Sequence, residues 1–127
     1  MGNLRKICVA VSLFALWGSP TYPNSPLSHT FAGCVGRFSA ELEHAWLMSK
    51  PETSDLEAQR LTFLSLLDAT LTQEHARKTL TYRIEVKMAH ASLLTLATFG
   101  QDAHRARKAK NAALRHITTC QNLLLDG

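Results

Sequence analysis

The chain has 127 residues, the usual size of one domain. Apolar residues make up 46% of it, enough for a single core, whereas the low contents of aromatic residues (7%), Gly and Pro argue against a β-sandwich and against a disordered chain. The formal net charge of +4 does not by itself indicate a nucleic-acid partner.

The first 18 residues show the succession of segments that is typical of a secretory signal. Arg5 and Lys6 form a short basic start, and an uninterrupted apolar run follows from 7 to 18. As a helix this run would span about 18 Å, against a hydrocarbon core of ~30 Å, so it is too short to cross a membrane. We therefore expect residues 1–18 to be a cleaved signal peptide, which leaves a net charge of +2. An uncleaved anchor and a buried N-terminal helix are the alternatives.

A polar linker is expected over 19–33, with the cleavage position open between residues 18 and 32. Cys8 lies in the predicted signal, so the mature chain keeps Cys34 and Cys120, which permit a single pairing. We expect a disulfide between them, in a periplasmic or secreted protein. Two alternatives stay open: Cys34 follows small residues of the kind that precede a lipid-modified cysteine, and both thiols could be free.

Four amphipathic helices are predicted in a domain over 34–127. Their expected bounds are 37–49, 55–71, 73–98 and 103–125. Pro51 ends the first and Gly100 the third, whereas no breaker marks the join near Thr72. Because the connections are short, consecutive helices must run antiparallel, which gives an all-α, up-down-up-down four-helix bundle. In this topology Cys34 and Cys120 share one end of the bundle.

Hydrophobic periodicity predicts which face of each helix is buried. The expected core positions are Phe38, Leu42, Ala45, Trp46 and Ser49; Leu56, Leu64, Leu67 and Leu71; Leu80, Ile84, Ala91 and Leu94; and Ala106, Ala113, Ile117, Cys120 and Leu124. Ser54, Thr72 and Asp102 are the expected N-caps of the second, third and fourth helices.

Common catalytic signatures are absent from the sequence. It contains no Cys-x-x-Cys, no phosphate-binding glycine loop, no His-Glu-x-x-His and no Gly-x-Ser-x-Gly. We therefore expect a binding or structural role without catalysis and without a cofactor.

Polar residues on three predicted helices form the candidate site. They are Glu41, His44, Arg60, Arg83, Lys87 and His90. Arg83, Lys87 and His90 share a broad arc with apolar residues of their helix, where charges must reach the edge or meet an acid. We expect Arg83, Lys87 and Glu41 to form a buried network that fixes helix register. A pocket for a small anionic ligand and a solvated face are the alternatives.

A metal- or haem-binding bundle with a carrier or redox role is the alternative function. Glu41 and His44 have the Glu-x-x-His spacing of di-metal bundles, but the sequence has no second copy of it, so no metal site is predicted. A haem would need methionine and histidine ligands on facing helices, for which the candidates are Met48, Met88, His90 and His116.

The last predicted helix carries a basic run. Its members are His104, Arg105, Arg107, Lys108, Lys110, Arg115 and His116. Most of these positions point away from the expected core stripe, and no aromatic residue is interleaved to stack on bases, so we expect no nucleic-acid partner. A solvated face is the main interpretation, and weak contact of helix 103–125 with an anionic membrane surface is the alternative. The partner classes left are an unknown protein and a small anionic ligand.

Overall fold

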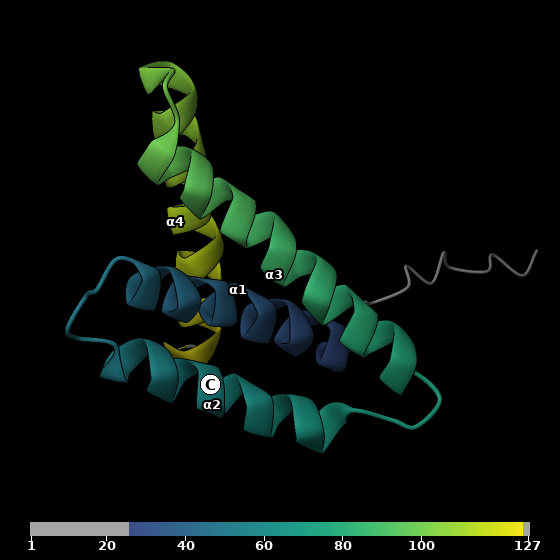
Figure 1. Ribbon diagram of the computed structural model, residues 1–127. Helices are drawn as coiled ribbons and strands as arrows, with labels where there is room; N and C mark the ends of the chain where they lie inside the picture. The colour runs from purple at the N-terminus through teal and green to yellow at the C-terminus, as the bar shows by residue number, and fades with distance from the viewer. Residues whose placement is uncertain (1–25, 126–127) are drawn as a thin grey trace, which may run out of the picture.

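The computed structural model describes residues 26–125, and this part of the chain consists of four helices joined by short connections (Figure 1). The helices are α1 (Leu27–Leu47), α2 (Ser54–Thr70), α3 (Ala76–Phe99) and α4 (Ala103–Leu125). The prediction of an all-α bundle is confirmed. The predicted signal peptide, with Cys8, lies outside the described residues, as do residues 19–25 of the predicted linker.

Helix α1 begins at Leu27, ten residues before the predicted start. Gly33 and Gly36 lower the intrinsic helix propensity of this segment, which is why periodicity alone placed the start after them. Both glycines are buried against α3, and a Cβ on Gly36 would lie 2.5 Å from the carbonyl oxygen of Arg83. Close packing of two helices at Gly36 therefore outweighs its low propensity.

Consecutive helices run in opposite directions, but the helices differ in how many of the others they contact. Helix α1 packs against α2, α3 and α4, and α3 also packs against α4. Figure 1 shows α4 crossing behind α1, while the upper ends of α3 and α4 extend beyond the α1–α2 pair. The bundle therefore has a closed part centred on α1 and a projecting α3–α4 hairpin.

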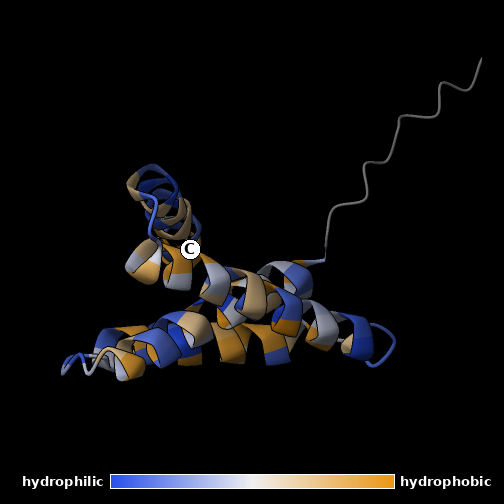
Figure 2. Ribbon diagram, turned by 45° about the horizontal axis from the view of Figure 1, so that its top comes forward, coloured by the Kyte–Doolittle hydropathy of each residue, from blue (hydrophilic) through white to orange (hydrophobic). Residues whose placement is uncertain are grey.

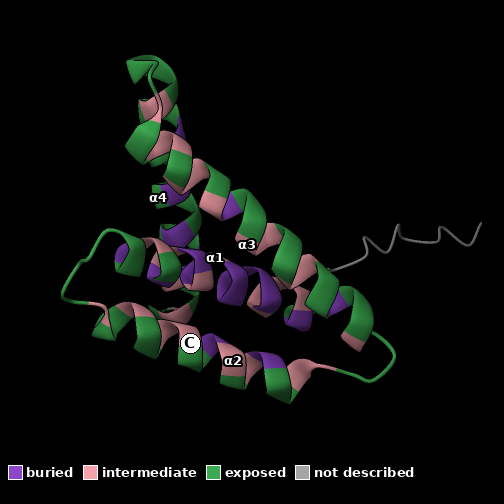
Figure 3. Ribbon diagram, in the orientation of Figure 1, coloured by how far each residue is buried: buried purple, intermediate pink, exposed green. Residues whose placement is uncertain are grey.

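The closed part contains the core. Buried residues are concentrated on α1, and orange apolar positions line the contact between α1 and α2 (Figures 2 and 3). The core cluster consists of Ala32, Cys34, Val35, Phe38, Phe63, Leu67, Ile117 and Cys120. The predicted pairing of cysteines agrees with the structure: the Sγ atoms of Cys34 and Cys120 lie 2.06 Å apart. This bond ties the last turns of α4 to the first half of α1.

The predicted buried face of α3 is wrong in the first half of the helix. Leu80 and Ile84 are exposed, Ile84 by 57%, whereas Ala91 and Leu94 are half-buried as expected. The fully buried positions of this helix are Thr79 and His90. In its first half the inner face includes an aromatic residue with a partner on α1, since the ring of Tyr82 stacks on that of His29 with centroids 3.6 Å apart. Leu80 and Ile84 are therefore left on the outer side.

On the other helices the expected core positions are buried or half-buried, except Trp46 and Ser49. Trp46 lies near the exposed end of α1, and Ser49 lies beyond it. The caps agree only in part. Asp102 caps α4, with its Oδ1 accepting a hydrogen bond of 2.9 Å from the Arg105 amide. Ser54 is not a cap, because its hydroxyl and amide bond to the Glu52 carboxylate instead. Helix α3 begins at Ala76, later than predicted.

Among the described helices, none has the length and apolar character required to cross a membrane.

Candidate functional site

The six predicted site residues divide into separate groups around α1. Glu41 and Glu43 are two positions apart on this helix, so their side chains point to different sides of it. Glu41 meets His90 of α3, whereas Glu43 meets Lys87 of the same helix. The expected contact of Glu41 with Arg83 and Lys87 is not among the ion pairs of the described residues.

The first group lines a cavity of about 270 Å³ between α1, α2 and α3. Arg60 enters it from α2, and Arg83 and Lys87 enter it from α3. The remaining lining residues are Val35, Gly36, Ser39, Glu43 and Ile84. Three cations from two helices therefore face one partly enclosed cavity.

The cations of this cavity outnumber its carboxylates. Lys87 Nζ forms an ion pair with Glu43 Oε1, and both side chains are partly exposed. Arg60 and Arg83 have no carboxylate within 4.0 Å among residues 26–125. The Nε atom of Arg60 is buried and has no hydrogen-bond partner there, although buried polar atoms in folded proteins are nearly always paired. The lining thus carries a formal charge of +2 and holds an unsatisfied donor.

The second group is a buried pair on the other side of α1. His90 Nε2 lies 2.8 Å from Glu41 Oε1, and the His90 side chain is only 1% exposed. The same imidazole is near a small hollow of about 110 Å³ that Arg37 and His116 also line. Partial burial, and after it the positive charge of Arg37, lower the pKa of His116.

His44 belongs to neither group, because its Nε2 lies 3.1 Å from the Thr98 hydroxyl. Glu41 and His44 thus have different partners, and the described chain contains no group of three or more His, Cys, Asp or Glu side chains that could hold a metal. The two methionines considered for haem, Met48 and Met88, are exposed on the surface. The geometry of residues 26–125 therefore provides no observation in favour of the metal or haem alternative.

Sequence reasoning missed Gly36 and Ser39 as lining residues. With Glu43 they are spaced i, i+3 and i+7, which places all three on one side of α1, so this spacing was the available signal. The spacing gives no signal when the helix is predicted to begin at residue 37, because Gly36 then lies outside it. The Ser39 hydroxyl donates a hydrogen bond of 2.7 Å to the Val35 carbonyl oxygen and is not free to act elsewhere.

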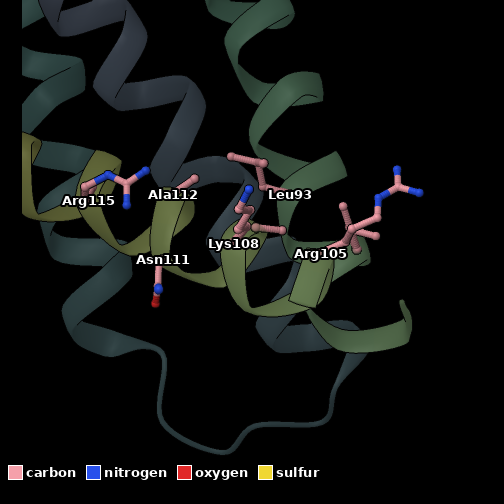
Figure 4. Close-up of a pocket in the computed structure, with 8 residues that line it drawn as sticks. Leu93, Arg105, Lys108, Asn111, Ala112 and Arg115 are labelled. Carbon is pink, nitrogen blue, oxygen red and sulfur yellow. The ribbon is translucent and has the colours of Figure 1, made fainter. Parts of the chain in front are cut away.

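A groove between α3 and α4 was also missed. It measures about 580 Å³ and is lined by Leu93, Leu96, Arg105, Lys108, Ala109, Asn111, Ala112 and Arg115 (Figure 4). The basic run of α4 is exposed to solvent, in agreement with the main interpretation of the sequence, and part of it also borders this apolar hollow.

No family model matches the chain, and neither a curated protein nor a solved structure matches it.

Proposed function

We propose that the protein is an exported helical domain that binds a small anion, without catalysis, in the cavity lined by Arg60, Arg83 and Lys87. The observation that carries this proposal is that three cations share one partly enclosed cavity with a single carboxylate. A carboxylate or phosphate ligand would supply the acceptors that Arg60 and Arg83 lack.

Electrostatics favours an anion with two negative charges. The lining carries a formal charge of +2 after the Lys87–Glu43 pair is counted, so a dianion would leave the occupied cavity neutral. Guanidinium groups present planar donor pairs that match the oxygens of carboxylates and phosphates. In a partly enclosed space these interactions are screened less than at an open surface.

Binding rather than turnover is supported by the side chains present. The only hydroxyl of the lining belongs to Ser39, which already donates to a backbone carbonyl, and no histidine lines this cavity to act as its base. An exported location is supported by the predicted signal peptide and by the pairing of Cys34 with Cys120, since disulfides persist in oxidising compartments.

The experiment is a thermal melt of the disulfide-bonded protein with inorganic phosphate, succinate, acetate or chloride at constant ionic strength. We expect the dianions to raise the melting temperature more than the monoanions, because a ligand that binds only the folded state stabilises it. Arg83→Ala should abolish the increase. Arg77→Ala removes an exposed arginine of the same helix that does not line the cavity, and it should leave the increase intact. Equal responses of the two variants, or no increase with any anion, would refute the proposal.

A further inference from the structure

A second surface, separate from the anion cavity, lies on the projecting α3–α4 hairpin. We infer that the groove between α3 and α4 binds an acidic amphipathic helix of a partner protein. The groove is about 580 Å³ in volume, and its apolar floor comes from Leu93 and Leu96 of α3 and Ala109 and Ala112 of α4. The inference goes beyond the proposed function, because none of these residues lines the anion cavity.

The positive charge along the groove favours an acidic partner. Arg105, Lys108 and Arg115 border it from α4, and no acidic residue lines it. Their spacing of i, i+3 and i+10 puts them on one side of the helix over about 15 Å, or nearly three turns. Figure 4 shows these three side chains distributed along α4, with Leu93 of α3 beside them. A partner with carboxylates at matching intervals would pair with this row.

The shape of the groove favours a helix over a membrane surface. Its floor residues on α4 are alanines, and Ala109 is almost fully buried, so the apolar atoms are recessed between two helices. A convex cylinder can reach such a floor, as in other complexes where an amphipathic helix occupies a groove. A flat bilayer would instead contact the protruding cations first and leave the floor uncovered.

The apolar surface continues beyond the groove. Leu96 also lines a neighbouring hollow of about 500 Å³ on the outer side of α3, together with Met88 and Phe99, which are both more than half exposed. Methionine side chains adapt readily to different partners. This continuation gives a partner helix additional apolar contact along the projecting α3–α4 hairpin (Figure 1).

A second copy of the chain fits the groove less well. Helix α4 has five Lys and Arg residues and no Asp or Glu, so a symmetric pairing of two grooves would bring like charges together. The acidic residues of α2 are on a helix whose apolar face is already covered by the core. A separate acidic protein therefore complements the groove better than a second copy of either α2 or α4 does.

The experiment uses two synthetic amphipathic helical peptides of about six turns, one with leucine and glutamate faces and the other with lysine in place of every glutamate. Binding to the full disulfide-bonded protein is measured by fluorescence anisotropy. We expect the glutamate peptide to bind at least about tenfold more tightly than the lysine peptide. Lys108→Glu should weaken its binding about tenfold, whereas Lys78→Glu makes the same charge change at the far end of α3 and should have little effect.

Ala112→Trp is the steric test, because it fills the groove without changing its charge. We expect it to abolish binding of the glutamate peptide while the anion-dependent melting temperature is retained, so that failure here is distinguishable from failure of the proposed function. Three results would overturn the inference: unchanged binding in Ala112→Trp, equal weakening by the two charge reversals, or Lys108-dependent binding to phosphatidylglycerol vesicles without binding to the peptide. Circular dichroism of each variant checks that it is folded, and Lys108→Glu alone decides the matter if Ala112→Trp does not fold.

Discussion

His90 Nε2 lies 2.8 Å from Glu41 Oε1, and this contact joins the middle of α3 to α1 through an imidazole that is almost completely buried. The other ring nitrogen of His90, Nδ1, has no hydrogen-bond partner among the described residues. The carboxylate is therefore the one polar group that satisfies this side chain. Glu41 fixes the rotation of α3 about its axis, because a different rotation would bury the imidazole without a partner.

Glu41→Ala should destabilise the protein by about 1–3 kcal/mol, since it leaves a buried imidazole without its partner. The matched control is Glu43→Ala, two positions along the same helix, which breaks only the partly exposed pair with Lys87. That change should cost less than about 1 kcal/mol. Urea unfolding of both variants measures the difference. Equal losses of unfolding free energy would show that the Glu41–His90 contact stabilises the protein no more than the Glu43–Lys87 pair does.

The number of helices could be predicted from the sequence, because Pro51, Gly100 and the capping Asp102 mark their ends. The start of α1 could not, because its glycines are tolerated only through their close contact with α3. The inner face of α3 could not be predicted either. This helix has apolar residues on two sides, and partners on α1, Glu41 and the His29 ring, decide which side faces inward.

The sequence singled out charged residues near the core but not how they are grouped. The predicted site contained six residues, and only its cations Arg60, Arg83 and Lys87 line one cavity in the structure; they stand out in the sequence because cations within apolar stripes are uncommon. Their acidic partners could not be assigned, since Glu41 and Glu43 are separated by only two positions and a rotation of α1 exchanges their surroundings. The sequence therefore indicates which charges are near the core, whereas helix packing determines which of them meet.

The disulfide should make a large contribution to stability. It closes a loop with a sequence separation of 86, for which the chain-entropy model gives about 4.6 kcal/mol. Replacing both Cys34 and Cys120 by alanine should lower the melting temperature strongly, and adding reductant to the unmodified protein should have the same effect. A reductant that lowers the melting temperature of the double variant as well would show that the effect has another cause.

The pH dependence of stability should include a contribution from His116. Partial burial and then the positive charge of Arg37, with smaller effects of His90 when it is protonated and of Arg115, lower the pKa of this group. The folded protein therefore binds its proton less readily than the unfolded chain does. By linkage, stability from this group is present above the ordinary histidine pKa and is lost as the pH falls through that range. Its pKa, measured by NMR titration, should lie below that of an unfolded histidine.

The control for this prediction is His116→Gln, which keeps a polar side chain at the same exposed position and removes the titration. The decrease in melting temperature between about pH 7.5 and about pH 5 should become smaller in this variant. An unchanged pH profile, together with an NMR pKa at or above the ordinary value, would contradict the prediction.

Gly36→Ala tests the link between helix packing and the anion cavity. A Cβ at this position would lie 2.5 Å from the Arg83 carbonyl oxygen and 3.1 Å from the Lys87 amide nitrogen, so the backbone of α3 must move away from α1. We expect a loss of about 1–3 kcal/mol of folding free energy, as for other overpacked cores. Because Arg83 and Lys87 also line the cavity, the same displacement should weaken anion binding.

Gly33→Ala is the matched control, three residues earlier on the same helix. Its new Cβ would meet only side-chain atoms, at 3.4 Å or more, from Tyr82 and Arg37. Alanine favours a helix over glycine by up to about 1 kcal/mol, so this variant should be as stable as the original protein or more stable. Urea unfolding and the phosphate-dependent melt of both variants measure the two effects. If Gly36→Ala were as stable as Gly33→Ala and retained anion binding, close contact between α1 and α3 would not be what shapes the cavity.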